Sequence, residues 1–180
     1  LGAVIVVIIF ILGGVFSLYN GLKEAEISVD AAYGQVENQM QRRSDLIPNL
    51  VNTVKGYDVH EKTIIEEVVN ARAKLAGAQG VEQMDAANAE LTSALGRLFA
   101  IAEAYPDLKA NTQYLELMRE LAGSENRIAV ARRDYNEAVR EYNVRISTFP
   151  GMFLAGSMGM TQKPQFKAKE GADAVPEVKF

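Results

Sequence analysis

The chain has 180 residues, of which 48% are hydrophobic and 23% charged, an ordinary balance for one folded domain with at most a small appendage. The formal net charge of −4 argues against a nonspecific nucleic-acid binder, which needs a basic face. The lack of cysteine excludes disulfides and thiolate metal sites, and a single histidine excludes any site with two imidazole ligands. The composition therefore argues against an enzyme and predicts neither a cofactor nor a bound metal.

The first part of the chain is strongly apolar. Residues 1–22 carry no charge, and residues 1–18 are apolar apart from one serine. As a helix rising ~1.5 Å per residue, this run spans about 27 Å, close to the hydrocarbon thickness of a bilayer. A cleaved signal peptide is the alternative, but the run is not followed by a small-x-small cleavage site. We therefore predict a retained single-pass transmembrane helix over residues 1–22. Because Lys23, Arg42 and Arg43 follow the span, the positive-inside rule favours a cytoplasmic domain.

Small residues recur every fourth position within this segment, at Gly13, Ser17 and Gly21. Such spacing lets helix backbones approach closely in lipid, and it predicts self-association along this face. The alternative is chance, because glycine and serine are common in spans that do not dimerise.

Beyond the apolar segment, hydrophobic residues recur at alternating steps of four and three, the pattern of a helix bundle or coiled coil. The first such helix runs from Val29 through Pro48 without a change of phase and ends at residues 55–58. Two further helices are predicted over about 58–76 and 81–105, and the fourth and longest over 114–149. The sequence thus predicts an all-α protein, in which a transmembrane helix precedes an elongated antiparallel bundle of long, coiled-coil-like helices over residues 23–149.

The helical period disappears after residue 149, so residues 150–180 are predicted to be an irregular tail. Glycines separate its first apolar residues, among them Phe153. If the helices run out and back twice, this segment returns to the membrane-proximal end. It then lies on the bilayer surface or on a neighbouring subunit, and the alternative is that it folds over its own bundle.

The hydrophobic residues at steps of four and three form a line along one face of each helix, here called the seam. Two polar residues, Arg43 and Ser124, occupy predicted seam positions. A guanidinium at such a position must find a carboxylate or carbonyl oxygens. We hypothesise that Arg43 and Ser124 fix helix register within the bundle or between subunits. The alternative for Arg43 is that only its stem packs while its charge reaches water.

Motifs that would carry chemistry are incomplete. His60 and Glu61 begin a zinc-protease motif, but its second histidine is replaced by Ile64. Residues 155–159 (AGSMG) approach the nucleophile motif of serine hydrolases without its first glycine. These motifs therefore predict no catalytic residue.

Residues 41–57 (QRRSDLIPNLVNTVKGY) resemble the LemA family of bacterial membrane proteins, and the resemblance continues through 68–72 (VVNAR), 97–105, 125–128 (ENRI), 131–136 (ARRDYN) and 142–143 (YN). It implies one N-terminal transmembrane helix in a bacterial cytoplasmic membrane, an elongated helical domain and no established enzymatic activity. Family members are discussed beside membrane proteases and in envelope or magnetosome-membrane contexts.

From the residues and the resemblance together, we predict a homo-oligomeric scaffold or membrane-shaping element anchored in the bilayer. The proposed assembly residues are Gly13, Ser17, Gly21, Arg43, Ser124 and Phe153. The alternative is an adaptor that presents its bundle to a membrane protease or an envelope-stress signalling partner.

Overall fold

The computed structural model describes residues 2–57 and 61–167. All regular structure in these two ranges is helical: α1 (Gly2–Lys55), α2 (Lys62–Gly77), α3 (Gly80–Ala102), α4 (Pro106–Lys109), α5 (Thr112–Ser147) and α6 (Gly151–Ser157). The predictions of an all-α chain and of an apolar N-terminal helix are therefore confirmed for the part of the chain that is described.

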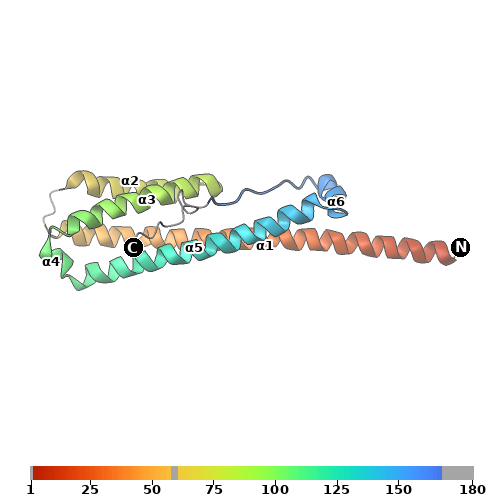
Figure 1. The fold of residues 1–180 in the computed structure, drawn as a ribbon, viewed down its shortest axis with the longest axis horizontal. Helices are drawn as coiled ribbons and strands as arrows, with labels where there is room; N and C mark the ends of the chain where they lie inside the picture. Colours follow the sequence, from red (N-terminus) through yellow and green to blue (C-terminus); the bar gives the residue numbers. More distant parts are fainter. Residues whose placement is uncertain (1, 58–60, 168–180) are drawn as a thin grey trace, which may run out of the picture.

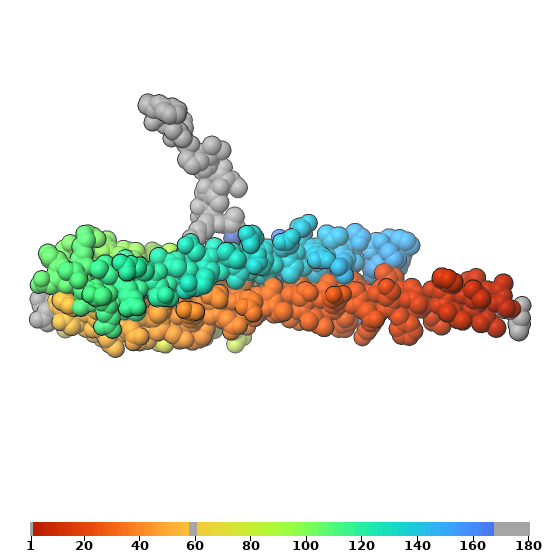
Figure 2. Space-filling model, turned by 90° about the horizontal axis from the view of Figure 1, so that it is seen from below, coloured from red at the N-terminus to blue at the C-terminus, as the bar shows by residue number. Residues whose placement is uncertain are grey.

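Helices α1 and α5 lie side by side and run in opposite directions, as both views show (Figures 1 and 2). Tyr33 meets Tyr135 with ring centroids 5.7 Å apart, and Arg43, further along α1, meets Glu125, which is earlier in α5. Helix α1 has 54 residues and continues through Pro48, as the unbroken phase predicted. The apolar beginning of α1 extends beyond every other element (Figure 1).

Helices α2 and α3 form a hairpin that packs on the half of α1 farther from its N-terminus (Figure 1). Lys74 of α2 pairs with Glu90 of α3 at 2.6 Å, and Arg97 of α3 pairs with Glu67 of α2 at 2.9 Å. Arg72 Nε of α2 donates to the Ser44 carbonyl of α1 at 3.0 Å, which fixes the hairpin to the long helix.

The core follows the predicted seams closely. Buried side chains lie three or four residues apart along each long helix, as on the apolar face of an amphipathic helix. In the fourth predicted helix, the period of three and four places Ala138 and Phe149 on the apolar face. Ala138 is half-buried beside the fully buried Val139, and Phe149 is 79% exposed. Phe149 lies outside the seam because α5 ends at Ser147, before Pro150 can interrupt the helical hydrogen bonds.

The joint between α4 and α5 is fixed by Asn111, which caps α5. Its side-chain oxygen accepts from the Tyr114 backbone at 2.9 Å, and its amide nitrogen donates to the Tyr57 hydroxyl at 2.6 Å. Helix α2 begins at Lys62, and the predicted start near residue 58 lies outside the described residues. Helix α3 ends at Ala102, earlier than predicted, because the chain turns into the short helix α4.

The prediction of an irregular tail needs correction at its start. Residues Gly151–Ser157 form helix α6, which packs against α5 and α1. After it, residues 160–167, here called the strap, run without regular structure back along the molecule toward α3 (Figure 1). Glycine-rich sequence predicts irregular structure locally, but tertiary packing overrides that propensity here.

Candidate functional site

The apolar segment of α1 is a candidate membrane span. Among the described residues, α1 is the helix long and apolar enough to cross a bilayer; its most apolar 18-residue window has a mean hydropathy of 2.6 and is 0% buried. Large side chains from Val4 to Phe16 face outward, whereas Leu22 is buried. Among the described residues, no other element covers the stretch from Val4 to Phe16, and the helix passes from it directly into the packed domain.

The three small residues predicted to form an association face lie in different surroundings. Gly13 and Ser17 are exposed, and a Cβ at Gly13 would meet no atom within 4 Å. Gly21 is half-buried, and its carbonyl accepts a hydrogen bond from Arg145 Nη1 at 2.9 Å. The face available to a second molecule therefore comprises Gly13 and Ser17, while Gly21 contacts α5 of its own chain.

Arg43 lies at the centre of a buried polar cluster that joins α1, α3 and α5. It is 3% exposed, and its Nη1 donates to the Asn88 side chain at 2.7 Å and to the Glu125 carboxylate. Burial lowers the pKa of the Arg43 guanidinium, and the charge of Glu125 opposes that shift. The whole guanidinium is enclosed with a carboxylate and an amide from the same chain, so it does not reach water as the alternative required.

Ser124, the other polar seam residue, is fully buried, and its hydroxyl donates to the Leu121 carbonyl at 2.7 Å. It therefore satisfies its hydrogen bond within α5. It is adjacent in sequence to Glu125, the carboxylate that contacts Arg43.

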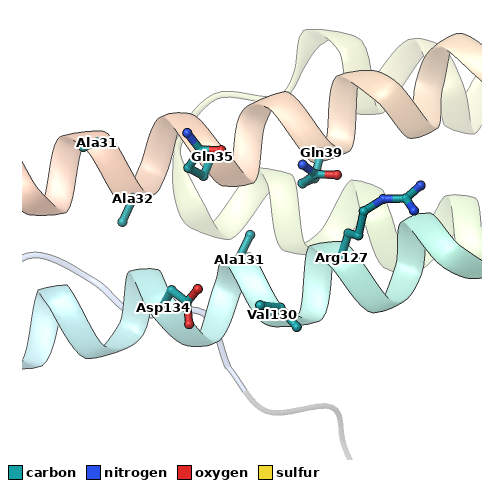
Figure 3. A pocket seen from close by; sticks show the side chains of 8 residues that line it. All are labelled: Ala31, Ala32, Gln35, Gln39, Arg127, Val130, Ala131 and Asp134. Atoms are coloured by element: carbon teal, nitrogen blue, oxygen red, sulfur yellow. The ribbon is translucent and has the colours of Figure 1, made fainter.

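A groove of about 460 Å³ lies between α1 and α5 (Figure 3). Its lining is mostly small or neutral: Ala31, Ala32, Gln35, Gln39, Arg127, Val130, Ala131 and Asp134. Val130 is 49% exposed. Small side chains keep this part of the α1–α5 surface hollow and open.

The strap is held by side chains of α5 that the hydrophobic periodicity did not identify. Asn136 Nδ2 donates to the Phe166 carbonyl at 2.9 Å, and its Oδ1 accepts from the Phe166 nitrogen at 2.8 Å. Asn143 makes the same pair of bonds with the backbone of Lys163, both at 2.9 Å. The signal was in the sequence, because Tyr-Asn occurs at 135–136 and again seven residues later at 142–143.

Phe166 fixes the end of the strap. Its side chain is 4% exposed and lies edge-on to Tyr135 with centroids 5.3 Å apart. Arg132 covers its other side at 4.8 Å from the ring centroid. The strap is thus part of the packed domain.

Within residues 2–57 and 61–167, no group of three or more histidine, cysteine or acidic side chains is arranged to hold a metal. Ser157, in the incomplete hydrolase motif, lies at the end of α6 and donates its hydroxyl to the Leu154 carbonyl at 2.7 Å. His60 lies outside the described residues. Two of the features described above are suited to contact a membrane or a second molecule: the exposed apolar segment of α1 and the α1–α5 groove.

Comparison with known proteins identifies relatives of this chain. The chain is 26% identical to magnetosome protein MamQ 2 of Paramagnetospirillum magneticum and 27% identical to magnetosome protein MamQ of Magnetospirillum gryphiswaldense, in each case over 86% of this chain and 66% of the relative. It is 25% identical to protein LemA of Metamycoplasma hominis, over 84% of this chain and 69% of the relative. The match thus covers about two thirds of the length of these relatives. The model of the LemA family matches residues 32–180, so the chain belongs to the LemA family.

Proposed function

We propose that this chain is a membrane-anchored, non-enzymatic helical protein that self-assembles in the bilayer as a scaffold or membrane-shaping element. The observation that carries the proposal is the continuity of α1, a single 54-residue helix. Its first part is the exposed apolar segment, and its remainder is the helix along which α5 packs. Since no flexible linker separates anchor from domain, the position of one fixes the position of the other.

The anchor belongs, in this proposal, to a bacterial cytoplasmic membrane that α1 crosses once. Lys23 follows the apolar segment, and Arg42 and Arg43 lie further along the same helix. The positive-inside rule places such a domain on the cytoplasmic side. The antiparallel α1–α5 pair then projects from the membrane, with the α2–α3 hairpin packed at its far end.

Two exposed features support association between copies. Gly13 and Ser17 are small residues on the part of α1 that no other described element covers. The groove between α1 and α5 is lined by residues such as Ala31, Ala32 and Ala131, against which a helix could pack closely. Several relatives are named as magnetosome proteins, which fits a structural component of a larger body.

The proposal is tested by the mass of the full-length protein extracted in mild detergent, measured by native mass spectrometry or particle imaging. A discrete large assembly supports the scaffold, and a monomer at all concentrations overturns it. A chain lacking residues 1–22 provides the comparison, with circular dichroism to check that its domain stays helical. A scaffold that assembles through the face of Gly13 and Ser17 should lose its assembly without the anchor. An adaptor for a membrane protease would instead bind its partner in solution without it.

A further inference from the structure

Two uncharged stretches that are far apart in the sequence meet at one end of the molecule. Residues 1–22 and residues 146–162 both lack aspartate, glutamate, lysine and arginine. The second stretch includes α6, which packs on the end of α5 and against α1. Both views show α6 beside the place where α1 leaves the rest of the molecule (Figures 1 and 2).

Helix α6 has a buried side and an exposed side. Gly151 and Ala155 are buried against the neighbouring helices. On the other side, Met152 is 47% exposed and Phe153 68%, and Phe149, which precedes the helix, is 79% exposed. The two phenylalanine rings meet edge-on with centroids 6.2 Å apart. We call Phe149, Met152 and Phe153 the α6 apolar face.

The orientation of this face is fixed by close packing. A Cβ on Gly151 would lie 2.3 Å from the Arg145 carbonyl oxygen and 3.8 Å from a methyl carbon of Leu22. Only glycine lets α6 approach α5 so closely. Arg145 in turn donates to the Gly21 carbonyl, so α5 and α6 are both tied to α1 at residues 21–22.

We propose that the α6 apolar face inserts into the interfacial layer of the bilayer, as a second membrane contact beside the span in α1. Residues 21–22 lie at the end of the uncharged run, immediately before Lys23, which is where a bilayer surface would cross α1. Because Gly151 lies beside Leu22, the α6 apolar face is at the same level. Exposed aromatic and thioether side chains without charged neighbours in sequence suit the boundary between headgroups and acyl chains. This inference rests on the anchoring role of α1 in the proposed function.

A second membrane contact would fix how the domain is oriented relative to the bilayer. One helix crossing a bilayer leaves the tilt and rotation of its domain open, whereas two contact points held rigidly together define both. The long axis of the α1–α5 pair would then take one orientation to the membrane. That orientation would be set by the packing of Gly151 on α5.

The chain contains no tryptophan, so Phe153→Trp introduces a single tryptophan into the face, and its emission is separated from that of the seven tyrosines by selective excitation. The full-length variant is reconstituted into phosphatidylcholine vesicles, with and without lipids brominated at defined acyl-chain carbons. Val69→Trp is the matched control, because Val69 is 44% exposed on α2, remote from α6 (Figure 1). We expect a blue-shifted Phe153→Trp emission and a loss of its intensity with lipids brominated near the carbonyl end of the chain. The Val69→Trp emission should be unaffected by bromination.

Flotation of the same vesicles distinguishes a failure of the α1 anchor from a failure of the α6 contact. Protein that does not float with the vesicles contradicts the anchoring role itself. Protein that floats but whose Phe153→Trp emission is not quenched by brominated lipid overturns the α6 contact alone. A blue shift that appears in detergent and grows with protein concentration, without quenching in vesicles, would overturn it in favour of a second copy of the chain on this face.

Discussion

Asn136 and Asn143 lie one heptad apart on α5, and each exchanges two hydrogen bonds with the backbone of one strap residue, Phe166 and Lys163 respectively. A carboxamide is suited to this task because it offers a donor and an acceptor side by side. The strap thereby satisfies backbone groups in a segment without regular structure. Asn136 and Asn143 connect the end of the described chain to the second half of α5.

Replacing both asparagines by alanine should release the strap without unfolding the helices. Each substitution removes two hydrogen bonds, and we expect a loss of about 1–2 kcal/mol per site in the free energy that holds the segment. Hydrogen exchange should show faster exchange at the Lys163 and Phe166 amides. Asn126→Ala, on an exposed position of α5, is the control. Unchanged exchange in the double variant would show that the remaining contacts, among them Phe166 packing and the Tyr135–Pro164 hydrogen bond, retain the strap.

The stability that the Tyr135 hydroxyl contributes through the strap should depend on pH. This hydroxyl donates to the Pro164 carbonyl at 3.0 Å, and burial raises its pKa above the ordinary value of about 10, with Tyr33 and Asp30 adding to the shift. A raised pKa in the folded state means that its contribution to stability is complete below pH 10. That contribution is lost as the pH rises through the folded-state pKa.

We therefore expect the stability difference between the wild type and Tyr135→Phe to shrink above pH 10. Near neutral pH the variant should be less stable by about 0.5–1.5 kcal/mol, the usual worth of one hydrogen bond. Urea unfolding at pH 8 and at pH 11 measures both values. A difference that is the same at the two pH values would contradict the assignment.

The periodicity of hydrophobic residues predicted the helices and their buried faces because burial on a helix repeats every three or four residues, whatever lies opposite. Leu91, Leu95 and Leu98 illustrate this: each is buried as expected. Periodicity cannot identify which other segment of the chain packs on a given helix face. Gly21 belongs to a small-residue stripe by spacing, but its neighbour is Arg145, 124 residues away in the chain.

The roles of Asn136 and Asn143 were missed for a related reason. Asparagine beside a seam position is usually solvated, and the segment that covers these two lies 20–30 residues later. The repeat of Tyr-Asn at a heptad interval was the available signal. Helix α6 was missed because its stability comes from the close approach of Gly151 to α5, which no local pattern encodes.

Replacing Arg43 tests whether a buried charge stabilises the packing of α1 against α3 and α5. Arg43→Leu removes the guanidinium from Asn88 and Glu125, and we expect a folded chain whose unfolding free energy is lower by about 3 kcal/mol. This is the low end for breaking a buried pair, because the Glu125 side chain is 25% exposed. The neighbouring Arg42→Leu is the control: Arg42 is exposed and pairs loosely with Glu120 at 3.6 Å, so it should change stability by less than about 1 kcal/mol.

If Arg43 also determines assembly, the oligomer formed by Arg43→Leu should differ in mass from that of the wild type. An unchanged mass together with the loss of stability would confine its role to one chain. Combining Arg43→Leu with Glu125→Leu should recover part of the stability, because an apolar pair replaces a carboxylate that has lost its contact with the guanidinium.

Two glycines of α6, Gly151 and Gly156, provide a matched pair of substitutions. Gly151→Ala places a methyl group against the Arg145 carbonyl and should displace α6, at a cost of about 1–3 kcal/mol. Gly156→Ala meets no atom within 4 Å and should leave stability unchanged or raise it slightly through helix propensity. Thermal unfolding of the two variants gives the comparison, and equal melting temperatures would contradict the packing described for Gly151.

The apolar part of α1 supplies the last prediction, on self-association. Gly13 and Ser17 lie on one face of the helix, and Gly14 is next to Gly13 but about 100° around the axis. If close backbone approach drives assembly, Gly13→Leu should separate the helices and lower the oligomer mass, because small residues at the contact are what permit that approach. Gly14→Leu adds the same side chain to another face and should leave the mass unchanged. Native mass spectrometry in mild detergent measures both variants at equal concentration. Equal masses for Gly13→Leu and the wild type would exclude this face from the interface and leave the α1–α5 groove as the surface to test.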